Sequence, residues 1–234
     1  MATTIRSALV SCCLALLVAL PASAALVIDN FEEGDFNVTA NEILGNTIFA
    51  EQSALLDENV AGGVRLVRVA NGGAVGTANA VLATTPDPVD DGVSISFIGA
   101  VGTGDYSFIY DGVANGLIDG IDGTLGLDLS AFDTIRVDVT GGATTTANLQ
   151  LTLWSSTTQQ IGALQPLVDG ANNFDLASFT LDKSDIQAIR LRLFDIDALE
   201  FPVITNIAAV PEPGTALLLS LGLVGLAARR RENR

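Results

Sequence analysis

The chain has 234 residues, with 27 acidic residues against 11 lysines and arginines, no histidine, and a formal net charge of −16. Such acidity argues against nucleic-acid binding, which depends on basic side chains that neutralise phosphates. Both cysteines, Cys12 and Cys13, lie in the first apolar segment. The rest of the chain therefore lacks the residues of zinc-finger sites and of Ser-His or Cys-His nucleophiles. The remaining oxygen ligands suit a hard cation such as calcium.

Residues 1–24 have the order of a secretory signal peptide. Arg6 precedes an apolar run at residues 8–20, and Ala22 and Ala24 occupy the small-residue positions of a cleavage site. A membrane-spanning first helix is the weaker interpretation, because the run is too short to cross a bilayer comfortably. We therefore predict export, with signal peptidase cutting before Ala25.

The middle of the chain, residues 25–209, has the patterning of β-structure. Apolar and polar residues alternate in several short segments, and glycine, aspartate, asparagine and threonine punctuate them. Alternation with one polar face is typical of antiparallel sheets that are wet on one side, and many short strands favour a sandwich. We predict an all-β, jelly-roll-like sandwich, with strands at residues 25–28, 64–69, 93–98, 135–139, 149–154 and 189–193.

Three aromatic residues are candidates for ligand binding. Trp154 shares the parity of Gln150 and Thr152, opposite three leucines, so it is predicted to face outward and could stack on a sugar ring. Tyr106 and Tyr110 share one face of their segment and are weaker candidates for the same role. Packing of all three rings inside the protein is the alternative.

Asp-Gly pairs cluster at Asp111-Gly112, Asp119-Gly120 and Asp122-Gly123. Tight turns are the favoured interpretation, because glycine allows positive φ and aspartate caps its own turn. Calcium loops are the alternative, although the spacing of an EF-hand is absent. The many carboxylates make chance pairs unavoidable, and without histidine or a nucleophile motif we expect that the protein is not an enzyme.

The C-terminal segment, residues 210–234, carries a specific signature. Pro211-Glu212-Pro213 is followed by an apolar run at residues 215–228 and then by Arg229-Arg230-Arg231. This order resembles the bacterial PEP-CTERM family of exported proteins. An apolar helix of this length extends about 21 Å, against a hydrocarbon core of roughly 30 Å, so it suits transient anchoring better than permanent spanning. A simple tail anchor without processing is the alternative.

The PEP-CTERM resemblance implies processing by an exosortase and a Gram-negative-type envelope. The chain would be held in the inner membrane by its C-terminal helix, with the arginines on the cytoplasmic side. After removal of the tail, the body would reach the cell surface or the extracellular matrix. The resemblance also implies an association with exopolysaccharide or biofilm.

Fragments of the body are similar to galactose-binding-like jelly rolls, the fold of many carbohydrate-binding modules. They are residues 28–34, which include Glu32 and Glu33, and residues 126–136. The resemblance implies a structural calcium ion shared by Glu32 or Glu33 with Asp195 or Asp197. The sequence thus leaves two functions open: a structural or interaction protein of the surface or matrix, or a carbohydrate-binding surface protein with structural calcium.

Overall fold

The computed structural model describes residues 24–33, 37–40, 47–71, 78–85, 92–99, 103–114, 123–141, 147–196 and 201–211. Ala25–Val210 forms one compact unit. Several features predicted from the sequence lie wholly or partly outside the described residues. They are most of the signal peptide, the sorting tail beyond Pro211, Asp197, and the pairs Asp119-Gly120 and Asp122-Gly123. Within them, no helix is long and apolar enough to cross a membrane.

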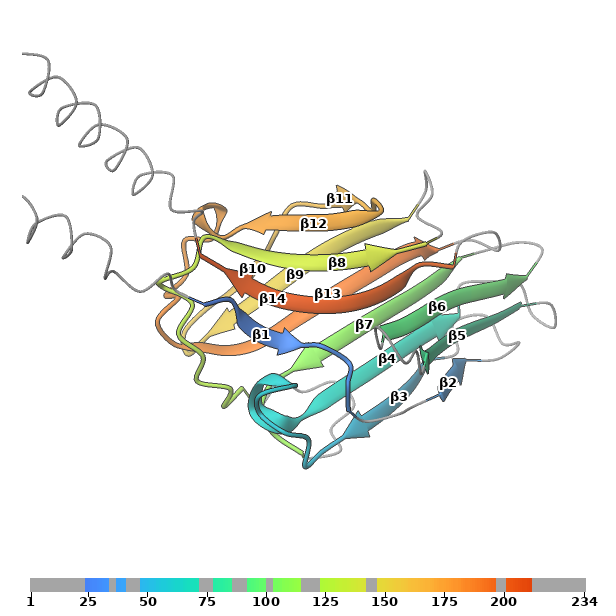
Figure 1. Cartoon of the computed structure of the whole chain (residues 1–234), viewed down its shortest axis with the longest axis horizontal. Helices are drawn as coiled ribbons and strands as arrows, with labels where there is room; N and C mark the ends of the chain where they lie inside the picture. Colours follow the sequence, from blue (N-terminus) through green and yellow to red (C-terminus); the bar gives the residue numbers. More distant parts are fainter. Residues whose placement is uncertain are drawn as a thin grey trace, which may run out of the picture. The chain divides into compact units, whose positions relative to one another are not determined.

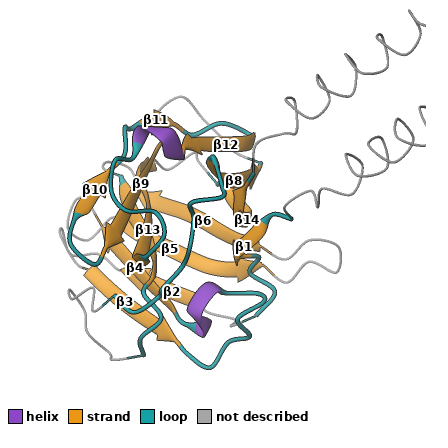
Figure 2. Cartoon of the chain, turned by 90° about the vertical axis from the view of Figure 1, so that its left-hand side faces the viewer, coloured by secondary structure: helices purple, strands orange, loops and turns teal. Residues whose placement is uncertain are grey.

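The described part of the body is a sandwich of two antiparallel sheets (Figure 1). Sheet A has the strand order β12-β8-β14-β6-β5-β2, with β1 beside β14, and sheet B has the order β10-β9-β13-β7-β4-β3, with β11 beside β9. The strands are β1 (Leu26–Asp29), β2 (Asn37–Ala40), β3 (Thr47–Gln52), β4 (Arg65–Asn71), β5 (Ala78–Thr85), β6 (Gly92–Gly99), β7 (Gly104–Tyr110), β8 (Thr134–Thr140), β9 (Asn148–Ser155), β10 (Gln159–Ile161), β11 (Gln165–Pro166), β12 (Gly170–Asp175), β13 (Ile186–Ile196) and β14 (Val203–Val210). Two single-turn helices, η1 (Ala61–Gly63) and η2 (Leu176–Ser178), lie in the connections (Figure 2).

The core lies between the sheets and is built from the alternation seen in the sequence. In sheet B, Leu149, Leu151 and Leu153 of β9 are fully buried. In sheet A, Ile135 and Val137 of β8 are buried in the same core. Successive strand residues point to opposite faces, so every second residue of these strands reaches the space between the sheets. The all-β sandwich and all six predicted strands are confirmed.

The two ends of the body are paired with each other. Strand β1 runs antiparallel to β14, with Leu26 opposite Ala209 and Val27 opposite Ala208 (Figures 1 and 2). On its other side β14 pairs with β8, so it is an interior strand of sheet A. Both the first and the last segments of the body are therefore part of the sandwich.

Candidate functional site

The outward face of sheet B gathers arginines around one tryptophan. Because the leucines of β9 and β13 face the core, the residues between them face outward. We call Trp154 of β9, Arg190 and Arg192 of β13, and Arg68 of β4 the arginine face. Arg192 pairs in register with Ser107 of β7, which in turn pairs with Arg68, so these two arginines flank one residue.

A single carboxylate is shared by two of these arginines. Arg192 donates from Nε to Oδ1 of Asp105 at 3.0 Å and from Nη2 to Oδ2 at 2.6 Å, a bidentate pair. Arg68 Nη1 lies 3.4 Å from the same Oδ2. The hydrogen bonds that Arg192 donates to Asp105 raise the pKa of Arg192 despite its partial burial, and the charge of Asp195 adds to this effect. Asp105 thus holds Arg68 and Arg192 in place.

Arg190 has a different environment. Its guanidinium carbon lies 5.4 Å from the centre of the Trp154 ring, within the range of a cation–π contact. Burial lowers its pKa, and the nearby charges of Arg192 and Arg68 lower it further. Among the described residues, the buried Nε of Arg190 has no hydrogen-bond partner. Arg190 therefore has cationic neighbours and the Trp154 ring beside it, and the charge of Asp105 opposes the effect of the two arginines on its pKa.

A second polar group beside Arg190 also lacks a partner. Thr152 of β9 pairs in register with Arg190, and it is fully buried although its parity is outward. Within the described part of the chain, its Oγ1 has no hydrogen-bond partner. Long arginine side chains cover shorter neighbours with their methylene groups, which accounts for burial on an outward face. Two adjacent polar groups thus have unused hydrogen-bonding capacity, an arrangement that normally costs stability.

The structure separates the three aromatic candidates. Trp154 lies on the face opposite the leucines and is half-buried, as the sequence predicted. Tyr106 and Tyr110 are fully buried, because their parity in β7 directs them into the core. Their hydroxyls donate to the carbonyl oxygen of Ser96 at 2.5 Å and to Oδ2 of Asp29 at 2.7 Å. Their assignment as ligand-binding residues is wrong, since neither ring reaches the surface.

Of the residues of the predicted calcium site, the structure describes Glu32, Glu33 and Asp195. Glu33 accepts a hydrogen bond from the backbone nitrogen of Leu56 at 2.6 Å, and Glu32 is exposed. Asp195, at a bulge in β13 with φ of 60°, accepts from Asn148 Nδ2 at 3.2 Å. In the described ranges no group of three acidic side chains could hold a metal ion, and the fourth candidate, Asp197, lies outside them. Calcium binding remains a prediction of the sequence resemblance.

The Asp111-Gly112 pair forms a turn, as predicted. Gly112 has φ of 74°, in the left-handed region that favours glycine. The Asp111 side chain accepts from the backbone nitrogen of Val113 at 3.2 Å.

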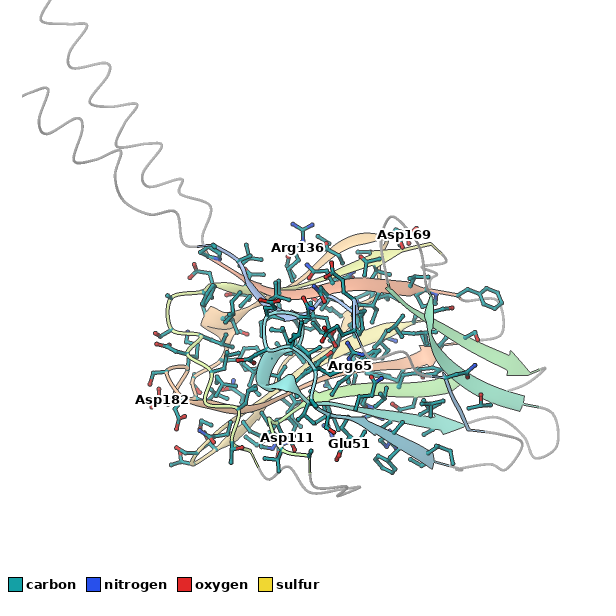
Figure 3. All side chains as sticks on the ribbon, turned by 60° about the horizontal axis from the view of Figure 1, so that its bottom comes forward. Glu51, Arg65, Asp111, Arg136, Asp169 and Asp182 are labelled. Carbon is teal, nitrogen blue, oxygen red and sulfur yellow. The ribbon has the colours of Figure 1, made fainter. Side chains whose placement is uncertain are left out.

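A buried polar cluster was not anticipated from the sequence. Asp29 of β1 and Arg65 of β4 are both fully buried and form a bidentate ion pair, with Nε–Oδ2 and Nη2–Oδ1 distances of 2.5 Å. Tyr110 and the backbone nitrogen of Phe31 donate to the same carboxylate. The Phe31 ring stacks 4.9 Å below the guanidinium. Figure 3 shows Arg65 in the interior, unlike Arg136 and Asp182 at the periphery.

This cluster joins the two sheets electrostatically, since Asp29 belongs to sheet A and Arg65 and Tyr110 to sheet B. Burial raises the pKa of Asp29, and its hydrogen bonds from Arg65 and Tyr110 oppose that effect. Burial and the charge of Asp29 raise the pKa of Tyr110 well above 10. One signal was available in the sequence: Arg65 shares the parity of Val67 and Val69, which face the core. The role of the cluster is structural, because the side chains of Asp29, Arg65 and Tyr110 are fully buried.

The tail of the chain matches a known family model. Residues 209–231 match the PEP-CTERM protein-sorting motif. The chain carries a PEP-CTERM sorting motif. The motif indicates an exported protein that is anchored by its C-terminus before exosortase processing, and it confirms the sorting signature predicted from the sequence. Its first two residues, Ala209 and Val210, are also the last two of β14.

The structure was also compared with solved structures of other proteins. It is similar to a family 11 carbohydrate-binding module of a cellulosomal cellulase from Clostridium thermocellum, with 13% identity over 82% of this chain and 96% of that chain, and a TM-score of 0.39. The same module in complex with a mixed-linked β-1,3-1,4 tetrasaccharide gives 13% identity, 81% and 98% coverage, and a TM-score of 0.40. The tailspike protein 4 domain of bacteriophage CBA120 gives 10% identity, 73% and 20% coverage, and a TM-score of 0.31. No curated protein matches the chain.

Proposed function

We propose that this exported, exosortase-processed protein serves at the cell surface or in the extracellular matrix, and that its body binds a polysaccharide through the arginine face of sheet B. The observation that carries the proposal is the Arg190–Trp154 pair on the outward face, where Arg190 has no ion pair among the described residues. A non-catalytic binding role and an association with biofilm belong to the same proposal.

The chemistry of this face suits a sugar chain. A half-buried indole offers apolar surface to one side of a pyranose ring, and fixed guanidinium groups offer directional donors to its oxygens. Gln150, two residues before Thr152 on β9, adds a side-chain amide whose Nε2 is only weakly engaged, since it donates to the Gly162 carbonyl oxygen at 3.4 Å. Because these groups stand on strands of one sheet, they are positioned with little loss of conformational freedom on binding.

The test is a glycan array with the processed protein, in wild-type form and with Trp154→Ala. We expect the wild type to bind a subset of polysaccharides, and Trp154→Ala to weaken that binding at least tenfold, because the ring contributes most of the apolar contact. Phe201→Ala is the matched control, since Phe201 is an exposed aromatic residue next to β14 in sheet A. If the wild type binds no glycan, the proposed polysaccharide binding is wrong, and a structural or protein-interaction role takes its place.

A further inference from the structure

The cations of the body are unevenly distributed over its two sheets. Its lysines and arginines are Arg65, Arg68, Arg136, Lys183, Arg190 and Arg192. Arg65 is neutralised in the core by Asp29, and Arg136 of sheet A pairs with Asp138 at 2.7 Å. Three of the remaining four stand together on the arginine face. The chain as a whole has a net charge of −16, so a face with three cationic side chains is unusual in it.

The acidic groups near this face are few. Asp105 lies between Arg68 and Arg192 and is bound to both. Asp195, at the end of β13, acts on Arg192. Glu51 stands on the edge strand β3, in register with Leu66. None of the ion pairs of the described residues includes Arg190, so one guanidinium is left over after the local carboxylates are matched.

Arg190 is also held ready for an acceptor. The Trp154 ring lies beside its guanidinium, and the neighbouring arginines disfavour further cations there. A guanidinium presents its donors in a rigid fork that matches a carboxylate, whereas a neutral hydroxyl engages only one of them. Arg190 and Arg192 are two residues apart on β13, about 7 Å along the strand, so the guanidinium without an ion pair stands beside the one that Asp105 already binds.

From this arrangement we propose that the ligand of the arginine face is an anionic polysaccharide, one of whose carboxylate groups binds Arg190 while a sugar ring packs against Trp154. This inference rests on the proposed function and adds to it the charge of the ligand. A carboxylate at Arg190 would form the ion pair that none of the described carboxylates forms with it, and would relieve the repulsion among the three arginines.

The experiment uses polygalacturonate and its fully methyl-esterified form, which share one backbone and differ in charge. Binding of the processed protein is measured by affinity electrophoresis or calorimetry in 50 and 300 mM NaCl. We expect the wild type to bind the acidic form at least tenfold more tightly, with affinity falling at the higher salt concentration because exposed charges are screened. A sulfated galactan is the third probe, which separates carboxylate from other anions.

Arg190→Gln keeps a polar side chain, removes the charge, and should reduce binding of polygalacturonate at least tenfold. Arg136→Gln is the control, because Arg136 is an exposed arginine in sheet A and should not affect binding. Thermal unfolding followed by circular dichroism checks that both variants fold. The wild-type comparison of the two polymers needs no variant, so the inference stays testable if Arg190→Gln does not fold.

Three results would overturn the inference. If the acidic and esterified polymers bind equally, the proposed polysaccharide binding stands, but the inference that the ligand is anionic is wrong. Binding of the sulfated polymer alone would make the carboxylate wrong. Binding of no polymer, here or on the glycan array, would remove the proposed function together with the inference.

Discussion

Asp29 is a fully buried acidic residue that links the two sheets of the sandwich. Its carboxylate accepts from Arg65, from the Tyr110 hydroxyl and from the backbone of Phe31, and both charges of the ion pair are fully buried. Taking two charges out of water is costly, and the hydrogen bonds offset that cost only while all partners are present. The cluster therefore stabilises one arrangement of the two sheets rather than adding to stability in general.

The first prediction concerns the two members of this ion pair. Asp29→Asn and Arg65→Met should each lower the free energy of unfolding by about 3–5 kcal/mol, because each leaves a buried charge without its partner. The double substitution should cost clearly less than the sum of the two, since it leaves neither charge behind. Urea unfolding followed by the fluorescence of Trp154, the single tryptophan of the chain, measures all four proteins. Additive losses would show that the two side chains are not coupled.

At the scale of elements, strand parity decides which residues are structural and which are available. In β7 it turns both tyrosines into the core, and in β9 and β13 it turns Trp154 and two arginines outward. In the connections, Asp128 and Asp175 start the same kind of turn, each accepting from the backbone nitrogen two residues later at 2.8 Å. These turns bury Leu129 and Leu176 beneath the sheets. Local hydrogen bonds thus shape these turns, and the alternation of side chains along each strand decides which residues face the core.

The second prediction concerns Thr152, whose hydroxyl is buried on the outward face of β9 without a partner among the described residues. Thr152→Val keeps the branched shape and removes the unsatisfied group, so it should raise the free energy of unfolding by about 1 kcal/mol. Urea unfolding of the processed protein measures the shift. Thr158→Val is a comparison, because the Thr158 side chain is exposed and its hydroxyl lies 3.1 Å from that of Ser155. A lower midpoint for Thr152→Val would mean that the hydroxyl is already satisfied.

For the molecule as a whole, the sorting motif begins inside the folded body. Ala209 is fully buried and pairs with Leu26 on one side and with Ile135 on the other. The backbone carbonyl of Val210 accepts from the backbone nitrogen of Asp133 at 3.2 Å. A cut within β14 would remove part of an interior strand and expose the backbone groups of two neighbours. The folded body can therefore lose its tail only beyond Val210.

The third prediction follows from that geometry. The protein recovered from the cell surface should begin at Ala25 and should retain every residue through Val210, as measured by intact mass and by sequencing of both ends. Glu212→Gln should block removal of the tail, leaving a heavier protein with the inner membrane, because the motif loses the charge between its two prolines. A mature C-terminus inside Val203–Val210, or equal masses for the two proteins, would contradict the prediction.

The sequence by itself determined the fold class, the export signature and the sorting motif, because these depend on local patterns: alternation, apolar runs and a short motif. It also placed Trp154 on the outward face, since the alternation of side chains along a strand is a local property. It did not reveal the buried ion pair of Arg65, because its partner Asp29 is 36 residues away in the other sheet. The gathering of Arg68 with Arg190 and Arg192 likewise required the pairing of β4, β7 and β13. Only the tertiary structure decided these contacts, because hydrogen-bonded register joins residues that the sequence keeps far apart.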